Sequence, residues 1–502
     1  MNVLLIMPYH CDLIHAVSLP LGILSIASYL EKHGVNVKIH DFSVHKASPK
    51  NVYPDFKPDI VGLSFPSCKA IDGMVKISKY YRKTGVPIVW GGSFCDVGDT
   101  QHFFDTGLVD IISYCEGEAT WLDLVRTLER GGDLADVEGI AYLKNGEVTV
   151  TPPRAFMDPA ELPQLDFSLV DVPDYYTYLY GCSKLVYVYL SKGCPAHCNF
   201  CVNTMCHRNT RRRRPLDVFM AEIEELAGTY GADGFYFGDE LAFASDKELY
   251  EVSDAFKNTG LPFHWGFQTR IGILSDQAIQ YAYDCGCRWI DFGVESGNRE
   301  MLAKVAKGIP YDKIESTFRA CSKAGLISIA NFIIGFPGET EEQFRDSIEL
   351  AQRLESTQNT FAKYIFVPST PGGQEVVRTF SKYPVFRKLN DYKQMDFFRN
   401  RQKLSHIPQK DLDVVQAYFL MNAIFRKDYS DSRDYDLLFK SVLTVVRRVS
   451  KMPFVCAVKA LEEISSDFAR FVICLTLHPG ILRKYGLKPP KEKRKNKKDS
   501  PE

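Results

Sequence analysis

The sequence has no apolar run long enough to cross a membrane and no recognisable export signal. A membrane span needs roughly 18 consecutive apolar residues, and no such stretch occurs along the 502 residues. The N-terminus has one short apolar run, without a basic segment before it or a small-residue cleavage site after it, which is typical of a buried strand. We therefore expect a cytoplasmic protein, whose 14 cysteines are buried thiols or metal ligands rather than disulfides.

An excess of charge of either sign is also lacking. The chain has 61 Lys and Arg against 62 Asp and Glu, a formal net charge of −1, so no overall field favours nucleic acid. The 26 Tyr and 33 Phe are dispersed and form no platform for stacking bases. A G-x-G-x-x-G fingerprint is missing after the first expected strand, which disfavours a nicotinamide or flavin dinucleotide. We expect neither a nucleic-acid partner nor a dinucleotide cofactor.

Strands and helices alternate over residues 1–135. Short β-rich runs are separated by stretches with helical periodicity, which is typical of right-handed βαβ units and a doubly wound, Rossmann-like parallel sheet. The expected strands are 2–7, 35–39, 59–64, 86–92 and 110–114, and the expected helices are 21–32, 74–82 and 119–129. The sequence therefore predicts an N-terminal α/β domain of the kind that binds nucleotides or cofactors.

The pattern weakens over residues 136–180 and then resumes. A hairpin is expected at Asn145-Gly146, followed by a Pro- and Asp-rich stretch, and we interpret this segment as a linker. Six strand candidates, each followed by helical periodicity, occupy residues 181–375. The strands are 185–191, 234–237, 264–269, 289–294, 327–335 and 363–367, and the helices are 215–229, 246–259, 276–285, 300–305, 311–324 and 340–354. They predict a partial, TIM-like (β/α)6 barrel with its working loops at the carboxyl ends of the strands.

The C-terminal region has a different character. Residues 376–486 carry no strand signal and indicate a mainly helical region, and the Lys-rich residues 487–502 are expected to form a disordered tail. Apolar and basic residues alternate over 437–461 and 468–486. Helices of this kind more often pack on a core, but peripheral contact with the inner face of a membrane and a lipid substrate stay open.

Three cysteines fall within eight residues, directly after the first strand of the second array. The spacing of Cys194, Cys198 and Cys201 arises by chance in about one in a hundred chains with this cysteine content. Three thiolates in a short loop can hold three irons of a 4Fe–4S cluster and leave the fourth iron free to bind a small molecule. The alternatives are unligated thiols and a structural zinc loop completed by His197, Cys206 or His207.

This cysteine motif, with Phe200 just before the third cysteine, resembles that of the radical S-adenosylmethionine (SAM) superfamily, over about residues 181–375. The resemblance implies that the open iron chelates the amino and carboxylate groups of SAM. It also implies that an electron from the cluster, supplied by a reductant such as flavodoxin or ferredoxin, cleaves SAM to a 5′-deoxyadenosyl radical.

Further positions match this family after successive expected strands. Gly238-Asp239-Glu240 resembles the segment that meets the SAM amino group, which a carboxylate suits by charge. Arg270, two residues after Gln268, would pair with the SAM carboxylate through its planar guanidinium. Glu295 resembles the residue near the ribose, and Gly335 begins a glycine-containing segment that resembles the one beside adenine. All of them fall at the expected carboxyl face of the barrel.

The N-terminal region resembles the cobalamin-binding domain of one branch of this superfamily, in segments 20–41, 59–64 and 89–92. Small residues at Ser64, Gly91 and Gly92 would leave room for the nucleotide tail of cobalamin. The D-x-H-x-x-G sequence that supplies an axial histidine in other cobalamin proteins is absent, so the cobalt is expected to have no histidine ligand from this domain. Cys115-Glu116-Gly117-Glu118 resembles the family's GEGE segment, to which we assign a structural loop role.

The expected function is that of a cobalamin-dependent radical SAM enzyme that transfers a methyl group to a carbon or phosphorus centre of a small-molecule or lipid substrate. By resemblance, cobalamin takes the methyl group from one SAM, and the radical from a second SAM removes a substrate hydrogen. The alternatives are radical cyclisation, oxidation or rearrangement without methyl transfer, and a non-enzymatic cobalamin or redox sensor. The run Arg211–Arg214 is either a site for an anionic substrate or electron donor, or a solvated surface.

Overall fold

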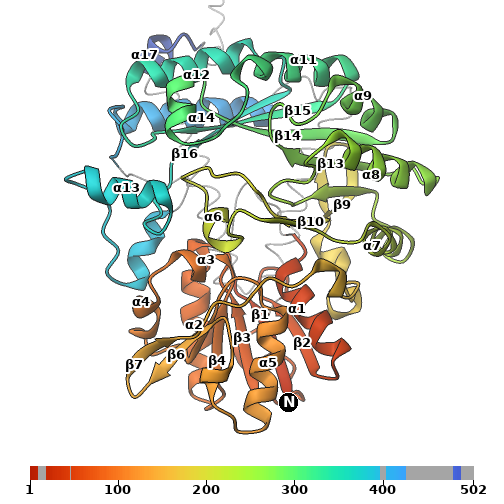
Figure 1. Ribbon diagram of the computed structural model, residues 1–502, viewed down its shortest axis with the longest axis vertical. Helices are drawn as coiled ribbons and strands as arrows, with labels where there is room; N and C mark the ends of the chain where they lie inside the picture. Colours follow the sequence, from red (N-terminus) through yellow and green to blue (C-terminus); the bar gives the residue numbers. More distant parts are fainter. Residues whose placement is uncertain (10–17, 46, 396–402, 426–478, 488–502) are drawn as a thin grey trace, which may run out of the picture.

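The computed structural model describes residues 1–9, 18–45, 47–395, 403–425 and 479–487. It contains two seven-stranded sheets, one in the N-terminal part and one in the central part of the chain. Figure 1 shows them as two units, one above the other, with α6 (Asn203–Cys206) and β10 (Ser191–Gly193) between them. The segment that carries the three cysteines therefore lies where the two units meet.

The N-terminal sheet has the strand order β2-β1-β3-β4-β5-β6-β7, in which the first five strands are parallel. This is the order of a doubly wound fold, as predicted. Its strands are β1 (Asn2–Met7), β2 (Asn36–Asp41), β3 (Ile60–Ser64), β4 (Ile88–Gly91), β5 (Ile111–Ser113), β6 (Ile140–Lys144) and β7 (Glu147–Val150). Its helices are α1 (Leu21–Lys32), α2 (Ile71–Arg82), α3 (Ser93–Val97), α4 (Thr100–Phe104) and α5 (Glu118–Glu129).

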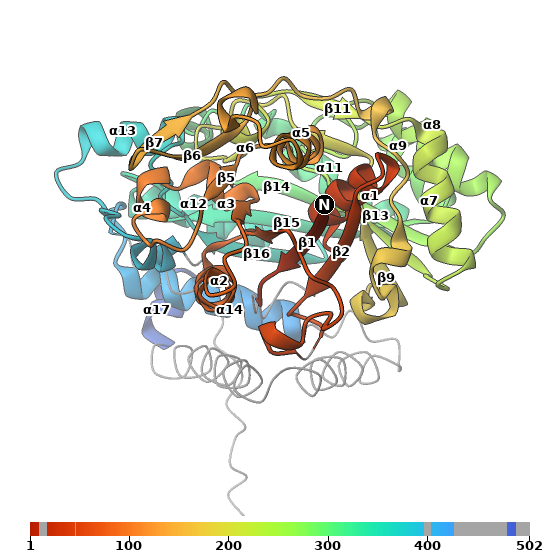
Figure 2. The same cartoon turned by 90° about the horizontal axis from the view of Figure 1, so that it is seen from below.

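Helices cover both faces of this sheet (Figure 2). Val3 and Leu5 of β1 belong to one core with α1 and α5, whereas Leu4 and Ile6 belong to another with α2. Because both faces of the strand are buried, its sequence is a continuous apolar run rather than an alternating one.

Part of the expected linker, residues 136–180, is not a linker but sheet. The predicted hairpin at Asn145-Gly146 is confirmed, and its strands β6 and β7 continue the N-terminal sheet antiparallel to β5. Further along, β8 (Thr177–Leu179) pairs with the first strand of the second sheet. The sequence pattern did not show that these strands join the two sheets, because β7 has no buried residue and β8 has only three residues.

The second sheet has the order β16-β15-β14-β13-β12-β9-β8, and all its strands except β8 are parallel. It curls without closing, so the predicted partial barrel is confirmed (Figure 1). Its parallel strands are β9 (Cys182–Val188), β12 (Gly234–Phe237), β13 (His264–Thr269), β14 (Cys287–Glu295), β15 (Ile327–Ile334) and β16 (Gln358–Lys363). Its helices are α7 (Leu216–Gly228), α8 (Asp246–Asn258), α9 (Asp276–Asp284), α10 (Arg299–Lys304), α11 (Ile314–Ala324) and α12 (Glu341–Arg353).

The last strand of the barrel, β16, starts at Gln358, five residues before the predicted start at residue 363. The prediction followed the apolar run Ile365-Phe366-Val367, but Phe366 and Val367 lie after β16 and pack into two other clusters. The strand itself has a mixed sequence, because Phe361 packs under a helix while Thr360 faces the other side.

Helices follow the barrel, as predicted: α13 (Pro371–Thr379), α14 (Gln409–Phe425) and α17 (Pro479–Lys484). Phe419 of α14 stacks on Phe361 of β16 with ring centroids 4.1 Å apart. The alternating segment 437–461, most of 468–486 and most of the Lys-rich tail lie outside the described residues. Within the described part of the chain, no helix is both long and apolar enough to span a bilayer.

Candidate cofactor sites

The loop that carries the three cysteines follows β10 and lies at the carboxyl face of the barrel. Cys194 and Cys198 are buried and Cys201 is half-buried. The Asn203 side chain donates to the Cys194 carbonyl over 2.9 Å, and Phe200 packs edge-to-face on Phe336. The loop backbone is therefore held from both sides, with its three thiols in one short segment.

The strand ends around this loop carry the predicted carboxylates Asp239 and Glu240, and the two have different partners. Asp239 accepts hydrogen bonds from Leu190 N–H and from the backbone and hydroxyl of Ser191, and its own carbonyl accepts from the Gln268 amide. Glu240 has 42% of its side chain exposed and accepts from Gly193 N–H over 2.9 Å. Asp239 and Gln268 thus hold the strand ends together, and Glu240 is the carboxylate that faces outward.

His207 changes the ionisation of Glu240. Its Nε2 lies 3.5 Å from Glu240 Oε1. Burial acts to raise the pKa of Glu240, but the hydrogen bond and charge of His207 outweigh this and hold the pKa below its ordinary value. Glu240 is therefore a stable anion at neutral pH.

Arg270 and Glu295 lie close to the loop through Lys307. Arg270 donates from Nη1 to Cys198 Sγ over 3.4 Å and from Nη2 to the Lys307 carbonyl. Lys307 Nζ lies 2.6 Å from Glu295 Oε1, and both side chains are nearly buried. Glu295 has a left-handed backbone with φ of 66°, which turns its side chain back toward this lysine. The structure thus brings the predicted positions 198, 270 and 295 together, with a lysine that the sequence argument had not included.

Gly335 occupies a tight turn at the end of β15, with φ of 78°. Its N–H and that of Phe336 donate to Glu339 Oε2 over 2.6 and 3.2 Å. Glu339 is fully buried and its Oε1 has no hydrogen-bond partner among the described residues. Burial raises the pKa of Glu339 to about 8 against the opposing effect of these two hydrogen bonds. At neutral pH the carboxyl is therefore mostly protonated.

A cavity of about 280 Å³ lies at the carboxyl ends of β1, β3, β4 and β5. The predicted residues Ser64, Gly91 and Gly92 all line it. Gly92 has φ of 101°, and a Cβ there would lie 2.9 Å from Phe65 N, so no other residue fits its backbone. Gly91 leaves space instead, because a Cβ there would touch only Ser113, at 3.5 Å or more. Carboxyl ends of parallel strands are the usual ligand edge of this fold.

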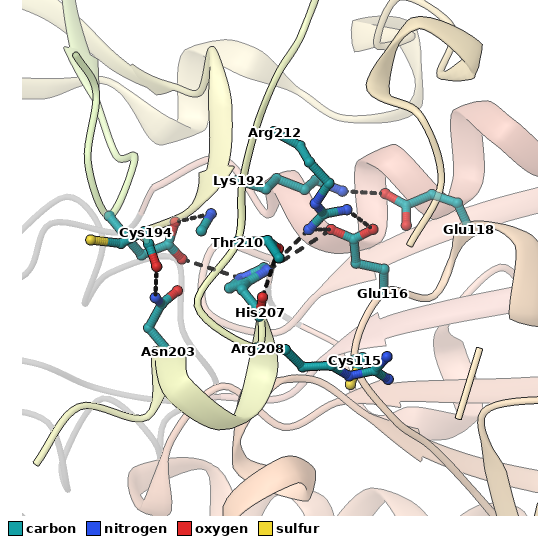
Figure 3. Close-up of polar contacts among 12 residues, drawn as sticks. Cys115, Glu116, Glu118, Lys192, Cys194, Asn203, His207, Arg208, Thr210 and Arg212 are labelled. Carbon is teal, nitrogen blue, oxygen red and sulfur yellow. Dashed lines mark hydrogen bonds and ion pairs between the residues drawn. The ribbon is translucent and has the colours of Figure 1, made fainter. Parts of the chain in front are cut away.

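The cavity is completed by residues of the second unit (Figure 3). Lys192 Nζ lies 2.6 Å from Glu118, and the two guanidinium Nη atoms of Arg212 each lie 2.7 Å from one oxygen of Glu116. Lys192, Cys206 and His207 line the cavity together with these two glutamates. The segment Cys115–Glu118, expected to be only a structural loop, therefore bonds the two units together at the cavity wall.

The four-arginine run is neither an open basic patch nor a solvated surface. Every one of its members has a carboxylate partner within 3.0 Å: Arg211 with Glu248, Arg212 with Glu116, Arg213 with Glu251 and Arg214 with Glu222. Residues 211–213 form strand β11, which pairs with β10. The charges are thus used to fix the cysteine segment to its neighbours.

Two of the three residues proposed to complete a zinc loop have other partners, and the third, His197, is exposed. Both ring nitrogens of His207 face glutamates, and Asp96 forms a hydrogen bond with Cys206. Across the described ranges, no three His, Cys, Asp or Glu side chains, those of Cys194, Cys198 and Cys201 included, lie close enough to share one metal ion. In a 4Fe–4S cluster each thiolate binds its own iron, so the three thiols need not converge on one point. Cys285, Cys287 and Cys321 are likewise buried free thiols.

Sequence reasoning missed the network of Glu116, Glu118, Lys192, His207 and Arg212. Two of the five, Glu116 and Glu118, belong to a motif that had been recognised, and their place after β5 puts them at the cavity edge. The others lie on the cysteine segment, more than 70 residues further along the chain. The local sequence around Lys192, His207 and Arg212 does not show which glutamates these residues will contact.

Comparison with known proteins identifies two regions of the chain. Residues 188–351 match the model of the radical SAM superfamily, and residues 14–125 match that of the B12 binding domain. An uncharacterised methyltransferase of Pyrococcus horikoshii is 27% identical over 70% of this chain and 76% of its own. The anaerobic magnesium-protoporphyrin IX monomethyl ester cyclase of Rubrivivax gelatinosus is 25% identical over 83% of this chain and 79% of its own.

A solved structure shares the whole architecture. The radical SAM methyltransferase TsrM of Kitasatospora setae, determined with cobalamin and a [4Fe-4S] cluster bound, has a TM-score of 0.67. The match has 17% sequence identity and covers 92% of this chain and 99% of that chain. At this identity the likeness establishes the fold.

Proposed function

Because the chain joins a B12-binding domain to a radical SAM domain and belongs with the enzymes built in this way, we propose that it is a cobalamin-dependent methyltransferase. One observation carries the proposal: the cavity at the carboxyl edge of the first sheet is walled by the segment that carries the three cysteines. Residues suited to two cofactors therefore meet at one interface. We propose that the chain divides near residues 135, 180 and 375. Of the strands between the first two limits, β6 and β7 belong to the N-terminal sheet and β8 belongs to the barrel sheet.

The cysteine loop fits a 4Fe–4S cluster held by Cys194, Cys198 and Cys201. The donor set is three thiols. Cys206 and His207 are engaged with Asp96 and Glu240, and His197, inside the loop, is exposed to solvent. Arg270 points at Cys198 Sγ, and a guanidinium there stabilises a thiolate. This supports a cluster with one open iron rather than a closed zinc site.

The surrounding strand ends fit SAM. Glu240 is an exposed anion beside the loop and suits the amino group, and Gly238 is exposed and adds no side chain in front of it. Glu295 suits the ribose hydroxyls, and the turn at Gly335 suits the adenine edge. We propose that Arg270 orients the cluster loop as well as the SAM carboxylate, because it already contacts Cys198.

The cavity at Ser64, Gly91 and Gly92 fits part of a cobalamin. Gly22 and Gly91 add no side chain to it, and apolar side chains such as Ile23, Ile26 and Trp121 line its inner wall. This combination of an apolar slot with polar groups at its mouth suits a heterocyclic base with a polar tail. His10 and His15 lie outside the described residues, and we propose that neither binds cobalt.

When bound, the reduced cluster with SAM supplies a hydrogen-abstracting radical, and cobalamin supplies a transferable methyl group. The chain's own residues place these groups and exclude water. Glu118 and Lys192 close one side of the cavity with a nearly buried ion pair, and Glu116 with Arg212 closes another. These ion pairs would keep the segment that carries the cysteines fixed at the wall of the cobalamin cavity, so that the two cofactors are held near each other.

The concave side of the barrel supports a substrate with a polar group. Gln268, Asp291, Asn331 and Thr360 form half-buried rows across the strands, and their neighbours on the other side pack under helices. Burial raises the pKa of Asp291 to about 7, while Tyr236 donates to its Oδ2. Its Oδ1 has no partner among the described residues. The Asp291 carboxyl suits a substrate with a hydroxyl or amine donor, and the rings of Tyr187, Tyr236 and Trp289 on the same face suit an apolar part of it.

A single anaerobic experiment tests the proposal. The protein is reconstituted with iron, sulfide and hydroxocobalamin, reduced with dithionite in the presence of SAM, and assayed for 5′-deoxyadenosine and bound cobalamin. We expect about one cobalamin per chain, and 5′-deoxyadenosine that is absent from Cys198→Ala. Production without bound cobalamin would contradict methyl transfer, and no production from a fully loaded cluster would indicate a sensor.

A second candidate is radical cyclisation or oxidation, which the similarity to the magnesium-protoporphyrin cyclase over 83% of this chain favours. Product mass separates the two reactions, since methylation adds about 14 mass units and cyclisation removes hydrogens.

Radical SAM enzymes need an external electron donor. For this chain we propose flavodoxin or ferredoxin, in the cytoplasm, without contact to nucleic acid. Binding to liposomes by sedimentation tests the alternative of peripheral membrane attachment.

A further inference from the structure

His207 lies between the two candidate cofactor sites and faces a carboxylate of each (Figure 3). Its Nε2 is 3.5 Å from Glu240, which belongs to the SAM site. Its Nδ1 is 3.9 Å from Glu116 and 3.3 Å from the guanidinium of Arg212, at the cobalamin cavity. The ring itself lines that cavity. It is thus one side chain that contacts both sites.

The backbone around His207 is held in an uncommon conformation. The next two residues, Arg208 and Asn209, are both left-handed, with φ of 49° and 55°. The turn is closed by the Thr210 N–H and hydroxyl, which donate to the His207 carbonyl over 2.9 and 2.7 Å. Consecutive left-handed residues that are not glycine are costly and persist only where the surrounding structure enforces them. The turn fixes the His207 backbone, and the ring is held by its contacts with Glu240, Glu116 and Arg212.

Gly193, directly before the first cysteine, makes this placement possible. Its φ is 84°, and a Cβ there would lie 2.2 Å from the Thr210 carbonyl oxygen and 2.9 Å from the His207 Cβ. The same residue donates its N–H to Glu240. The cysteine segment, His207 and Glu240 are therefore packed as one unit, and a shift of any one moves the others.

Glu116 is fixed on the opposite side. Arg212 donates to both of its oxygens, and the guanidinium lies 4.0 Å above the ring of Phe156. Arg208 lies over the same ring, at 4.8 Å. A ligand that fills the cavity restricts Glu116, and through Glu116 and Arg212 it restricts His207 and Glu240. The geometry thus provides a continuous path of charge pairs from one cavity wall to the other site.

We propose that His207 is a positioning residue that couples the two cofactor sites, so that cobalamin bound in the cavity strengthens the binding of SAM at Glu240. The inference rests on the proposed function, because it takes Glu240 as the residue that meets the SAM amino group. Coupling between two sites is reciprocal, so SAM strengthens cobalamin binding by the same factor. An enzyme with this coupling binds SAM more tightly once the methyl carrier is present.

The test measures SAM affinity with and without cobalamin. Protein reconstituted with iron and sulfide is titrated anaerobically with SAM, once without and once with saturating hydroxocobalamin, and the ratio of the two Kd values is determined. We expect a ratio of at least about fivefold for the wild type. For His207→Gln, and for Glu116→Gln, the ratio falls to within about twofold of one. In the double variant no further loss occurs, because both residues act in one path.

A matched control is His102→Gln. His102 is a partly buried histidine that contacts Tyr392 and neither cavity, so this variant keeps the wild-type ratio. A wild-type ratio near one, or an unchanged ratio in His207→Gln, would overturn the inference while 5′-deoxyadenosine formation and cobalamin binding leave the proposed function standing. Failure of the wild type to bind hydroxocobalamin would overturn both.

Discussion

The two ligand edges of this protein are built by opposite means. At the N-terminal sheet the edge consists mainly of small residues and apolar walls, such as Gly91, Gly92 and Trp121, so it selects by shape. At the barrel the edge carries charged side chains that are already engaged, such as Arg270 with Cys198 and Glu295 with Lys307. An edge that selects by shape, here called the shape-built edge, should lose stability or ligand affinity when side-chain volume is added. An edge of paired charges, the charge-built edge, should lose them when one charge is removed. Substitutions of each kind should therefore act differently at the two edges.

The largest effect is expected from the cysteine loop at the barrel edge. Cys198→Ala removes a cluster ligand and should reduce iron content and 5′-deoxyadenosine formation to background. Cys206→Ala, five residues after the last ligand of the loop, is the control and should retain the cluster. Iron analysis and the deoxyadenosine assay measure both variants. Retention of a full cluster in Cys198→Ala would remove this loop from the cofactor site.

Glu339 makes the stability of the barrel edge depend on pH. Its pKa of about 8 lies above its ordinary value of 4.5, so between these pH values the folded state binds more protons than the unfolded state. Its stabilising contribution is present below about pH 4.5 and is lost as pH rises through 8. We expect the free energy of unfolding to fall by up to about 4 kcal/mol between pH 5 and 8 from this group.

Glu339→Gln should flatten that decrease, because glutamine is neutral throughout. Urea unfolding at several pH values measures it. Glu342→Gln, on the exposed side of the first turn of α12, is the control and should leave the slope unchanged. An identical slope in wild type and Glu339→Gln would show that Glu339 does not titrate in this range.

The shape-built edge is tested by adding one methyl group. Gly92→Ala places a Cβ against Phe65 on a left-handed backbone, and we expect a loss of about 2 kcal/mol of stability together with weaker cobalamin binding. Gly91→Ala adds the same group where only ordinary contacts exist, so its stability should change by less than about 0.5 kcal/mol. Chemical denaturation compares the two. Equal losses would mean that the backbone at Gly92 is not the cause.

The smallest effect concerns the pairs between the edges. Arg212→Gln removes the bidentate partner of Glu116 at the cavity, and we expect about tenfold weaker binding of hydroxocobalamin. Arg213→Gln breaks an ion pair with Glu251 one residue further along the same strand but away from the cavity, and should change this affinity less than twofold. Titration followed by absorbance measures both. Similar affinities for the two variants would indicate that bound cobalamin does not reach Glu116.

What could be predicted from the sequence follows the same division. Buried strands such as 2–7 and 264–269, and the glycine at 335 in its tight turn, can be recognised in the local sequence. Burial and a tight turn each restrict which residue types can occur at those positions. The three cysteines were found by spacing. The mixed strand 358–363 was missed because half of its pattern depends on α14 packing against it. The partners of Glu116 and Glu118 were missed because an ion pair across 74 or 96 residues leaves no trace in either local segment.

The four arginines of β11 also bear on the order in which the protein folds. Their partners lie 8, 37, 38 and 96 residues away, so closing these contacts costs different amounts of chain entropy. Glu116 is the one partner that precedes the run, and on the ribosome the sheet that carries it is already synthesised when Arg212 emerges. The other three partners follow later. The order of synthesis therefore allows the cysteine segment to meet its N-terminal partner before the rest of the barrel is made.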